Sequence, residues 1–329
     1  MTDKHVHHYI PKKYLRGFAA VGEKSLIWEF SRDEPEFEPG RKRGRNNPAL
    51  ISLEKLAGAE RDGYAYAKTD GAIDSNFYED KLAGIEQRHN GVIDKIRNRE
   101  MITAGEKEDF TKYIALTLRR VPARKNTTPR LWLDVVQDFK RNRLPGLLDR
   151  LDELIAAADP TDNERRDRLT EQRRMAVTLI EEYKRSGIPR KIELDTLVDS
   201  DMKKIRGAIT SMRWQFVKAP PDRYFVTSDN PVHIFKGGVG LRTPYSELVL
   251  PMSSKCALVA SYRDVREGFV PGNGQVVNEI NRRVVSQSVR YAYGPRADAW
   301  ILKLLRKTFH RFELLYSYND VGGELPRPL

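Results

Sequence analysis

Residues 224–235 have the sequence YFVTSDNPVHIF, and this stretch decides the fold class. Two short apolar segments, 224–227 and 232–235, flank a Ser-Asp-Asn-Pro turn, a pattern that is typical of β-strands joined by a turn. Further short apolar segments follow at 247–250 and 257–261. The C-terminal third of the chain is therefore expected to contain several strands.

Upstream of this stretch, apolar residues recur every three or four positions, which predicts helices. We expect helices over about 74–96, 106–121, 128–144, 147–157, 162–187 and 194–214, a strand over 25–30, and a further helix, strand and helix over 276–288, 290–293 and 298–308. Strands and helices do not alternate as they do in βαβ units. The sequence predicts an α+β fold with an N-terminal strand segment and helices, a long helical middle and a C-terminal mixed sheet with helices. We expect a single domain over residues 1–329, with a helical insertion at about 127–213.

Composition excludes several classes of protein. The chain has 329 residues, of which 40% are apolar and 9% aromatic, and this is typical of a globular protein and not of a disordered one. Its longest apolar runs, such as Leu154–Ala158, have about five residues, whereas a membrane span needs about 20. A single cysteine, Cys256, excludes an internal disulfide, and no apolar signal segment follows Met1. We expect a cytoplasmic protein with no membrane partner.

The formal net charge of +12 suggests a polyanionic partner where the cations are clustered. One cluster lies at residues 40–45, GRKRGR, and includes Arg41, Lys42 and Arg43. A second includes Arg119, Arg120 and Arg124, and both clusters are rich in arginine, which binds phosphate through two parallel hydrogen bonds. Cations at 165–174 alternate with acidic residues, so we expect ion pairs on a solvated helix there. Nucleic acid is the expected partner, and no protein partner follows from the sequence.

The N-terminal run HVHHYIP, residues 5–11, is dense in functional side chains. Histidine transfers protons near neutral pH and ligates metals, so His8 is a candidate acid or base. The other interpretation is a packed histidine near the chain terminus. A metal would need more ligands, and the histidines further along the chain have no partner at ligand spacing, so we predict no metal ligand. The cofactor stays unknown, with a divalent metal ion as an open alternative.

Polar residues at the ends of elements are the other candidates. Asp229 follows an expected strand, where a carboxylate can face an open edge, although the same residues also suit an Asx turn that bonds its own backbone. Arg120 lies at the border of the buried face of its helix, where it can aim at a ligand or form a structural salt bridge. Asn281 shares an apolar helix face and needs a hydrogen-bond partner. Glu79 and Glu86 share one side of a helix, which suits acid and base chemistry or simple solvent exposure.

Read in order, these pieces resemble the domain-of-unknown-function family 4238. Residues 8–18, HYIPKKYLRGF, resemble its opening HYVPxxYLxxF, and residues 228–231, SDNP, match its strand motif. Further parts of the chain resemble the family pattern in the same order. They are Phe77 to Glu79 with Glu86, Arg120 to Pro122, Trp214, residues 250–253, Asn281 and residues 290–291. The resemblance covers nearly the whole chain, apart from about 129–195. It implies a site that includes His8, and some relatives are associated with bacterial defence against phage.

Our leading hypothesis from the sequence is a nuclease that acts on RNA or DNA. His8, Asp229, Arg120 and Glu86 would be the catalytic residues, with His8 as base or acid and Arg120 as a phosphate contact. The substrate would be bound by Tyr9, Arg16, Asn230, Asn281, Arg124, Arg41, Lys42 and Arg43. The alternative is a non-enzymatic nucleic-acid-binding or defence sensor protein whose polar motif residues are structural. A third class, an enzyme on a small phosphorylated ligand, would show a deep closed pocket.

Overall fold

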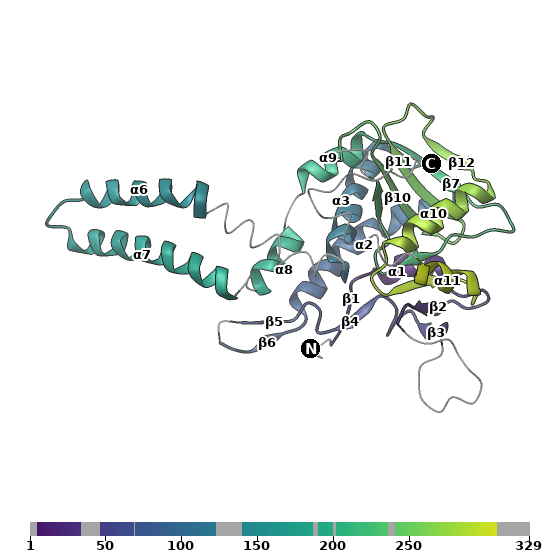
Figure 1. Cartoon of the computed structure of the whole chain (residues 1–329), viewed down its shortest axis with the longest axis horizontal. Helices are drawn as coiled ribbons and strands as arrows, with labels where there is room; N and C mark the ends of the chain where they lie inside the picture. The colour runs from purple at the N-terminus through teal and green to yellow at the C-terminus, as the bar shows by residue number, and fades with distance from the viewer. Residues whose placement is uncertain are drawn as a thin grey trace. The chain divides into compact units, whose positions relative to one another are not determined.

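The computed structural model describes residues 5–33, 47–68, 70–122, 140–186, 190–199, 202–235 and 241–307. The chain divides into two compact units, one formed by residues 1–123 with 197–329 and the other by residues 124–196. The first unit contains the strands, and helices lie against them (Figure 1). The protein has the α+β fold that the sequence predicts.

The larger sheet of the first unit lies in the C-terminal third of the chain. Its strand order is β12 (Gly268–Pro271), β7 (Arg213–Lys218), β11 (Cys256–Ser261), β10 (Glu247–Ser253) and β9 (His233–Phe235). Neighbouring strands in this sheet are antiparallel, except that β12 and β7 are parallel to each other. Every residue of β11 is buried, so the middle of this sheet is covered on both faces.

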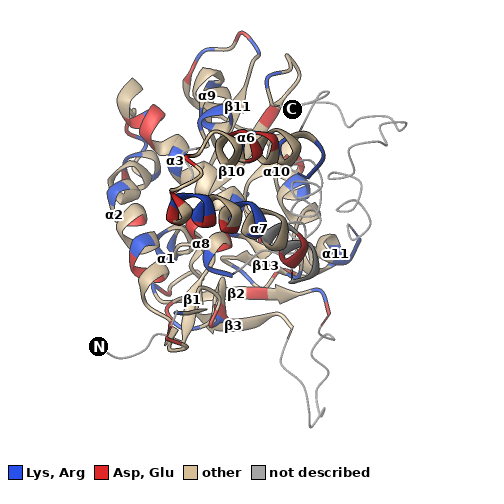
Figure 2. Ribbon diagram, turned by 90° about the vertical axis from the view of Figure 1, so that its left-hand side faces the viewer, with Lys and Arg blue, Asp and Glu red and all other residues tan. Residues whose placement is uncertain are grey.

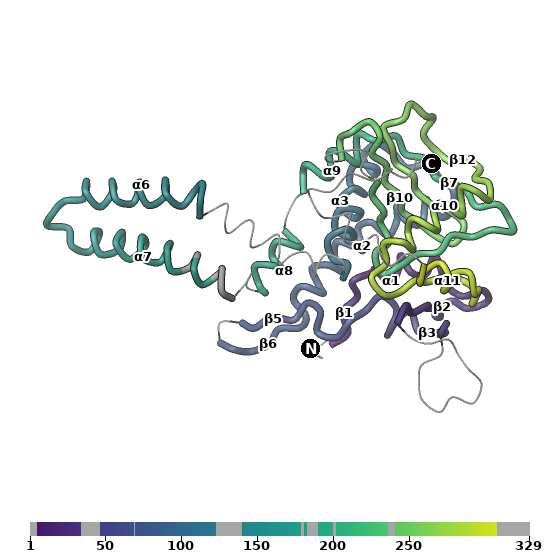
Figure 3. The backbone as a smooth tube through the Cα atoms, in the orientation of Figure 1, coloured from purple at the N-terminus to yellow at the C-terminus, as the bar shows by residue number. Residues whose placement is uncertain are grey.

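The smaller sheet combines two strands from the N-terminal part of the chain with two from the C-terminal part. Its order is β3 (Ala49–Ser52), β2 (Leu26–Ser31), β13 (Tyr291–Gly294) and β8 (Thr227–Ser228), all antiparallel. Two short ribbons precede α2, formed by β1 (Val6–His8) with β4 (Ala59–Arg61) and by β5 (Tyr66–Ala67) with β6 (Ile73–Asp74). In Figure 3 the chain runs from β1 into α1 (Lys12–Leu15), a 3-10 turn (Arg16–Phe18) and then β2.

The described part of the first unit also contains the helices α2 (Phe77–Arg97), α3 (Ala104–Arg120), α9 (Lys203–Ser211), α10 (Gly274–Ser286) and α11 (Ala299–Lys307). Helix α3 packs against α2 and α9, while α10 contacts β8 of the smaller sheet and β10 of the larger one. In the main core, the Phe110 ring of α3 packs against Trp214 of β7, which in turn packs against Phe216, so α3 and β7 are joined. The hydrophobic contacts of α3 and α10 therefore fix the positions of both sheets.

The helix termini follow from local sequence. Thr103 accepts a hydrogen bond from the Glu106 amide, and the Glu106 carboxylate accepts one from the Thr103 amide, which makes a capping box for α3. At α2 the N-cap position is Asn76, and the Asp74 carboxylate accepts from the amides of Asn76 and Phe77. Asp74, the last residue of β6, therefore binds the first amides of α2, while the Asn76 side chain makes no capping hydrogen bond.

The second unit contains α6 (Leu144–Ala156) and α7 (Asn163–Ser186), which pack against each other. The Arg173 guanidinium contacts the Asp152 carboxylate at 2.6 Å between the two helices. Along α7 the pairs Arg174 with Glu171 and Arg168 with Glu164 confirm the predicted solvated, ion-paired helix, and Figure 2 shows the two signs alternating along it. Helix α8 (Arg190–Asp199) follows, and its last residues belong to the first unit.

The predicted single helix over 194–214 is divided into α8 and α9 and ends at Ser211. Met202 has a left-handed φ of 46°, which separates α8 from α9, and Trp214 lies in strand β7. The segment RWQFVK of β7 pairs with β11. This pairing makes the segment a strand, although the helical spacing before it predicted a helix. The predicted strand over 224–227 is reduced to Thr227 and Ser228, because residues 224–226 make no ladder. None of the described helices is long and apolar enough to cross a membrane.

Candidate functional site

Arg120, at the end of α3, is fully buried and donates hydrogen bonds to three protein groups. Its Nε bonds to the carbonyl oxygen of Tyr9 at 2.8 Å, and its two terminal nitrogens bond to the His8 carbonyl oxygen at 2.5 Å and the Glu86 carboxylate at 2.6 Å. Burial alone would lower its pKa, but the Glu86 carboxylate and neighbouring tyrosines hold the pKa above its usual value. Arg120 therefore holds the N-terminal segment against α2 and α3.

The His8 side chain is 5% exposed, and neither ring nitrogen has a hydrogen-bond partner among the described residues. Burial lowers the pKa of His8 to about 4, and the nearby Lys12 and Arg120 cations add to this shift. The His8 backbone is bonded instead, since its carbonyl oxygen accepts from Arg120 and its amide donates to Glu79. The imidazole is thus neutral near pH 7 and inside the protein.

Asp229 follows β8 and is 1% exposed. Its carboxylate accepts from the amides of Val289 at 2.8 Å, Arg290 at 2.6 Å and Tyr291 at 2.9 Å. Burial raises its pKa to about 6, while these three donors and the nearby Arg32 oppose the shift. Asp229 therefore joins the end of β8 to the start of β13, some 60 residues away in the sequence, and does not form the local Asx turn that the sequence allowed.

Two buried asparagines have the same kind of role. Asn230 donates to the carbonyl oxygen of Gln287 at 3.0 Å, and the Gln287 side chain donates back to the Asn230 carbonyl oxygen at 2.9 Å. Asn281, on α10, accepts from the Val226 amide and donates to the Tyr224 carbonyl oxygen, both at 3.0 Å. The prediction that Asn281 is buried and partnered is confirmed, and both asparagines hold residues 224–230 against α10 and the turn that follows it.

The candidate residues fall into two groups joined by Tyr9. One group contains His8, Glu86 and Arg120, and the other contains Asp229, Asn230 and Asn281. The Tyr9 carbonyl oxygen accepts from Arg120, and its buried hydroxyl hydrogen-bonds Tyr293 near Asp229, with burial raising the pKa of Tyr9. No hydrogen bond within the described residues connects the His8 ring to Asp229. We call these seven residues the motif network.

The other sequence candidates lie apart from this network or outside the described residues. Arg16 is half exposed and contacts the Glu54 carboxylate at 2.6 Å, which lowers the pKa of Glu54. Arg41, Lys42, Arg43 and Arg124 lie outside the described residues. No group of three or more His, Cys, Asp or Glu side chains that could hold a metal ion occurs in the described part of the chain.

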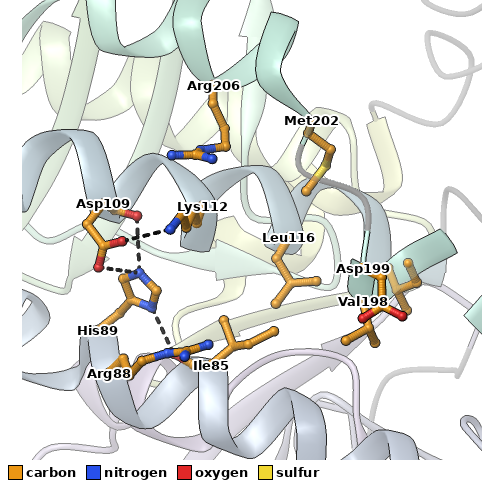
Figure 4. Close-up of a pocket in the computed structure, with 11 residues that line it drawn as sticks. Ile85, Arg88, His89, Asp109, Lys112, Leu116, Val198, Asp199, Met202 and Arg206 are labelled. Carbon is orange, nitrogen blue, oxygen red and sulfur yellow. Dashed lines mark hydrogen bonds and ion pairs between the residues drawn. The ribbon is translucent and has the colours of Figure 1, made fainter. Parts of the chain in front are cut away.

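One pocket among the described residues was not expected from the sequence. A cavity of about 310 Å³ lies between α2, α3, α9 and the last residues of α8 (Figure 4). Its lining consists of Ile85, Arg88, His89, Asp109, Lys112, Leu116, Leu197, Val198, Asp199, Met202 and Arg206. We call it the helix pocket. The sequence did contain one sign of this pocket, because one face of each helix mixes charged and apolar residues. These residues are Ile85, Arg88 and His89 on α2, and Asp109, Lys112 and Leu116 on α3.

Fold and site together define an α+β protein whose N-terminal segment is held by buried polar groups, with a pocket of charged and apolar side chains between helices. The sequence model of the family described as Protein of unknown function (DUF4238) matches residues 6–298, and the chain belongs to this family. Neither the curated proteins nor the solved structures gave a match.

Proposed function

We propose that this protein binds nucleic acid without cleaving it, and that the motif network stabilises its fold. The observation that supports this most is that Arg120 and Asp229 already bond to groups of the protein itself. Arg120 donates at all three guanidinium nitrogens to protein oxygens, and Asp229 accepts three backbone amides. A general acid, general base or phosphate contact must instead offer such groups to the substrate.

Helix α9 supports a nucleic-acid partner. Its sequence KKIRGAITS has three cations and no acidic residue, and Lys203 and Lys204 are exposed. A side chain at Gly207 would meet the guanidinium of Arg242 at 3.3 Å, so a fourth cation lies beside the helix. The blue segments of α9 in Figure 2 show this concentration of charge. Such clusters bind phosphates by displacing counterions, which fits the net charge of +12.

The test is the salt dependence of binding to labelled single-stranded and double-stranded RNA and DNA. The double variant Lys203→Gln with Lys204→Gln should weaken binding and reduce the slope of log affinity against log salt by about 2, or about 1 for each lost phosphate contact. The matched control is Lys303→Gln with Lys307→Gln, which removes two exposed cations from α11 and should leave the slope unchanged. Wild-type protein that binds none of these probes would contradict the proposal.

A second candidate function, nuclease activity at His8, has one observation in its favour. Buried polar atoms without partners are uncommon in folded proteins, and both ring nitrogens of His8 are such atoms. Lys12 and Glu54 lie close enough to influence its pKa. A catalytic histidine would use these nitrogens on a substrate that enters beside α1, with or without a divalent metal ion. Against this, a pKa of about 4 makes His8 a poor general acid near pH 7.

Cleavage assays separate the two candidates. We expect no cleavage of RNA or DNA by the wild-type protein, either with Mg²⁺ or Mn²⁺ or without them. Cleavage that His8→Gln abolishes, at an unchanged melting temperature, would replace the binding proposal with the nuclease. A binding protein without activity would act as a sensor, which is the role in defence against phage that the family resemblance suggests.

A further inference from the structure

Tyr245 is the most exposed phenylalanine, tyrosine or tryptophan in the described part of the chain. The residue is 67% exposed. Its ring makes no aromatic contact, and its hydroxyl makes no hydrogen bond, with any described residue. A single exposed aromatic residue is common on protein surfaces, so the groups around it decide whether it has a role.

A short turn fixes the backbone of Tyr245. The Ser246 amide donates to the Thr243 carbonyl oxygen at 2.9 Å, and the hydroxyl groups of these two residues are hydrogen-bonded at 2.7 Å. Pro244 lies at the second position of the turn, which suits proline, and β10 begins two residues after Tyr245. The aromatic ring therefore extends from an ordered backbone, which reduces the entropy lost when a ligand binds to it.

This turn lies beside α9. The Arg242 guanidinium lies 3.3 Å from the point where a side chain at Gly207 would begin, and the three residues from Arg242 to Tyr245 span at most about 10 Å. The adjoining strands agree, since the first residue of β10 pairs with the last residue of β11. The next residue, Tyr262, donates to the carbonyl oxygen of Ala208 in α9 at 3.0 Å, and Figures 1 and 2 show β11 next to this helix.

The surface that α9 forms with this turn is cationic. Residues 202–211 and 241–246, which we call the α9 surface, contain four cations and no acidic residue. Lys204 and Arg242 are exposed, and their side chains have no ion pair with any described residue. Lys204 precedes Gly207 by three positions, so it lies on the side of the helix where Arg242 rests. Two available cations therefore lie near one exposed aromatic ring.

We propose that the α9 surface binds single-stranded nucleic acid and that Tyr245 stacks against one of its bases. Lys204 and Arg242 would hold the phosphates of the strand, because cations that follow the backbone and rings that stack on bases are the two parts of such surfaces. In a duplex the faces of the bases are covered by the neighbouring base pairs. A single strand can turn a base outward, so only the single strand can use the ring.

This inference rests on the proposed function, since it names the kind of strand that the cations of α9 bind. Every base has a face that can stack on a ring, so we expect little preference for base sequence. RNA and DNA single strands share the base and the phosphate, and the titrations below use both.

A labelled decanucleotide of mixed sequence, as a single strand and as a duplex with its complement, tests the proposal by fluorescence anisotropy with the full chain. The single strand should bind at least about threefold more tightly than the duplex at the same salt concentration. Tyr245→Ala should weaken single-strand binding by about tenfold, because the stacking is lost. The slope of log affinity against log salt should not change, because no phosphate contact is removed. Tyr245→Phe keeps the ring and should bind within about twofold of the wild type.

An abasic strand of the same length separates stacking from charge. It has the same phosphates but no bases, so the wild type and Tyr245→Ala should bind it equally. The matched control is Trp300→Ala, which removes an exposed aromatic side chain from α11 and should leave single-strand affinity within about twofold. Tyr245 is exposed, so its variants should fold, and an unchanged melting temperature confirms this.

Equal binding of the single strand and the duplex, or equal single-strand binding by the wild type and Tyr245→Ala, overturns the proposal. If Lys203→Gln with Lys204→Gln still flattens the salt slope in that case, nucleic-acid binding stands and only the stacking inference fails. Wild-type protein that binds none of the probes rejects both. A loss on Tyr245→Ala with RNA, with DNA or with both supports the proposal and identifies the strand that the α9 surface binds.

Discussion

The motif network and the helix pocket use the same residue types in opposite ways. In the network, the arginine and the aspartate are buried, and their hydrogen bonds go mainly to backbone groups of distant segments. In the pocket, Arg88 is exposed and has no partner among the described residues. Charged groups that are fully bonded inside a protein hold its segments together, whereas charged groups left open at a cavity are available to a ligand. Arg120 and Asp229 therefore hold segments of the protein together, whereas Arg88 lies open at a cavity.

Removal of the Arg120 side chain should have the largest effect on stability. Arg120→Met leaves the Glu86 carboxylate and two carbonyl oxygens without their donor, so we expect a loss of about 3–5 kcal/mol in unfolding free energy. Urea denaturation measures it. Arg88→Met is the matched control from the pocket and should change the unfolding free energy by less than about 0.5 kcal/mol. Equal effects of the two substitutions would end the distinction between the two regions.

Asp229→Ala should have the next largest effect. The amides of residues 289–291 lose their buried acceptor, and we expect about 2–3 kcal/mol of destabilisation. Asp222→Ala provides the control in the same unit, because its side chain is 73% exposed and should contribute within about 0.5 kcal/mol. A stable Asp229→Ala protein would mean that these hydrogen bonds do not support the sheet.

The pH dependence of stability tests the state of His8. Its folded pKa of about 4 lies below the ordinary value of 6.5, so between these values the unfolded chain binds the proton more tightly. The contribution of His8 is therefore fully present above about pH 6.5 and is lost as pH falls through 4. Between pH 7 and pH 5 the wild type should lose about 2 kcal/mol more unfolding free energy than His8→Gln. The same slope in both proteins would show that the His8 ring is not held neutral by burial.

Charge removal from α9 should have the smallest effect on the fold. Lys203→Gln with Lys204→Gln should leave the unfolding free energy within about 0.5 kcal/mol of the wild type, because both side chains are exposed. Nucleic-acid affinity should nevertheless fall and its salt slope flatten. A variant that unfolds more easily and still binds with the wild-type slope would place α9 among the structural elements.

The sequence was sufficient for the fold class and for much of the secondary structure. Short apolar segments predicted β2, β10, β11 and β13 to within a few residues, and helical spacing predicted α3 and α10. Strand β7 was missed because RWQFVK directly follows a helix and becomes a strand only by pairing with β11. Local periodicity carries no information about such pairing.

The site was less predictable, because its partners are distant in sequence. The helical position of Arg120 indicated the border of the buried face and allowed a structural salt bridge, which it forms with Glu86, but gave no sign of its bonds to the backbone of His8 and Tyr9. The amides that bind Asp229 lie some 60 residues away. The pocket arginines Arg88 and Arg206 come from helices that only the tertiary fold brings together.

The most direct test of a structural motif network combines unfolding and binding for one conservative variant, Asp229→Asn. Its unfolding free energy and its affinity for nucleic acid should be measured on the same preparation. We predict a lower unfolding free energy and an unchanged affinity for each folded molecule, since Asp229 contacts backbone amides and not a ligand. An unchanged unfolding free energy together with lost binding or lost cleavage would contradict the account and make Asp229 a functional residue.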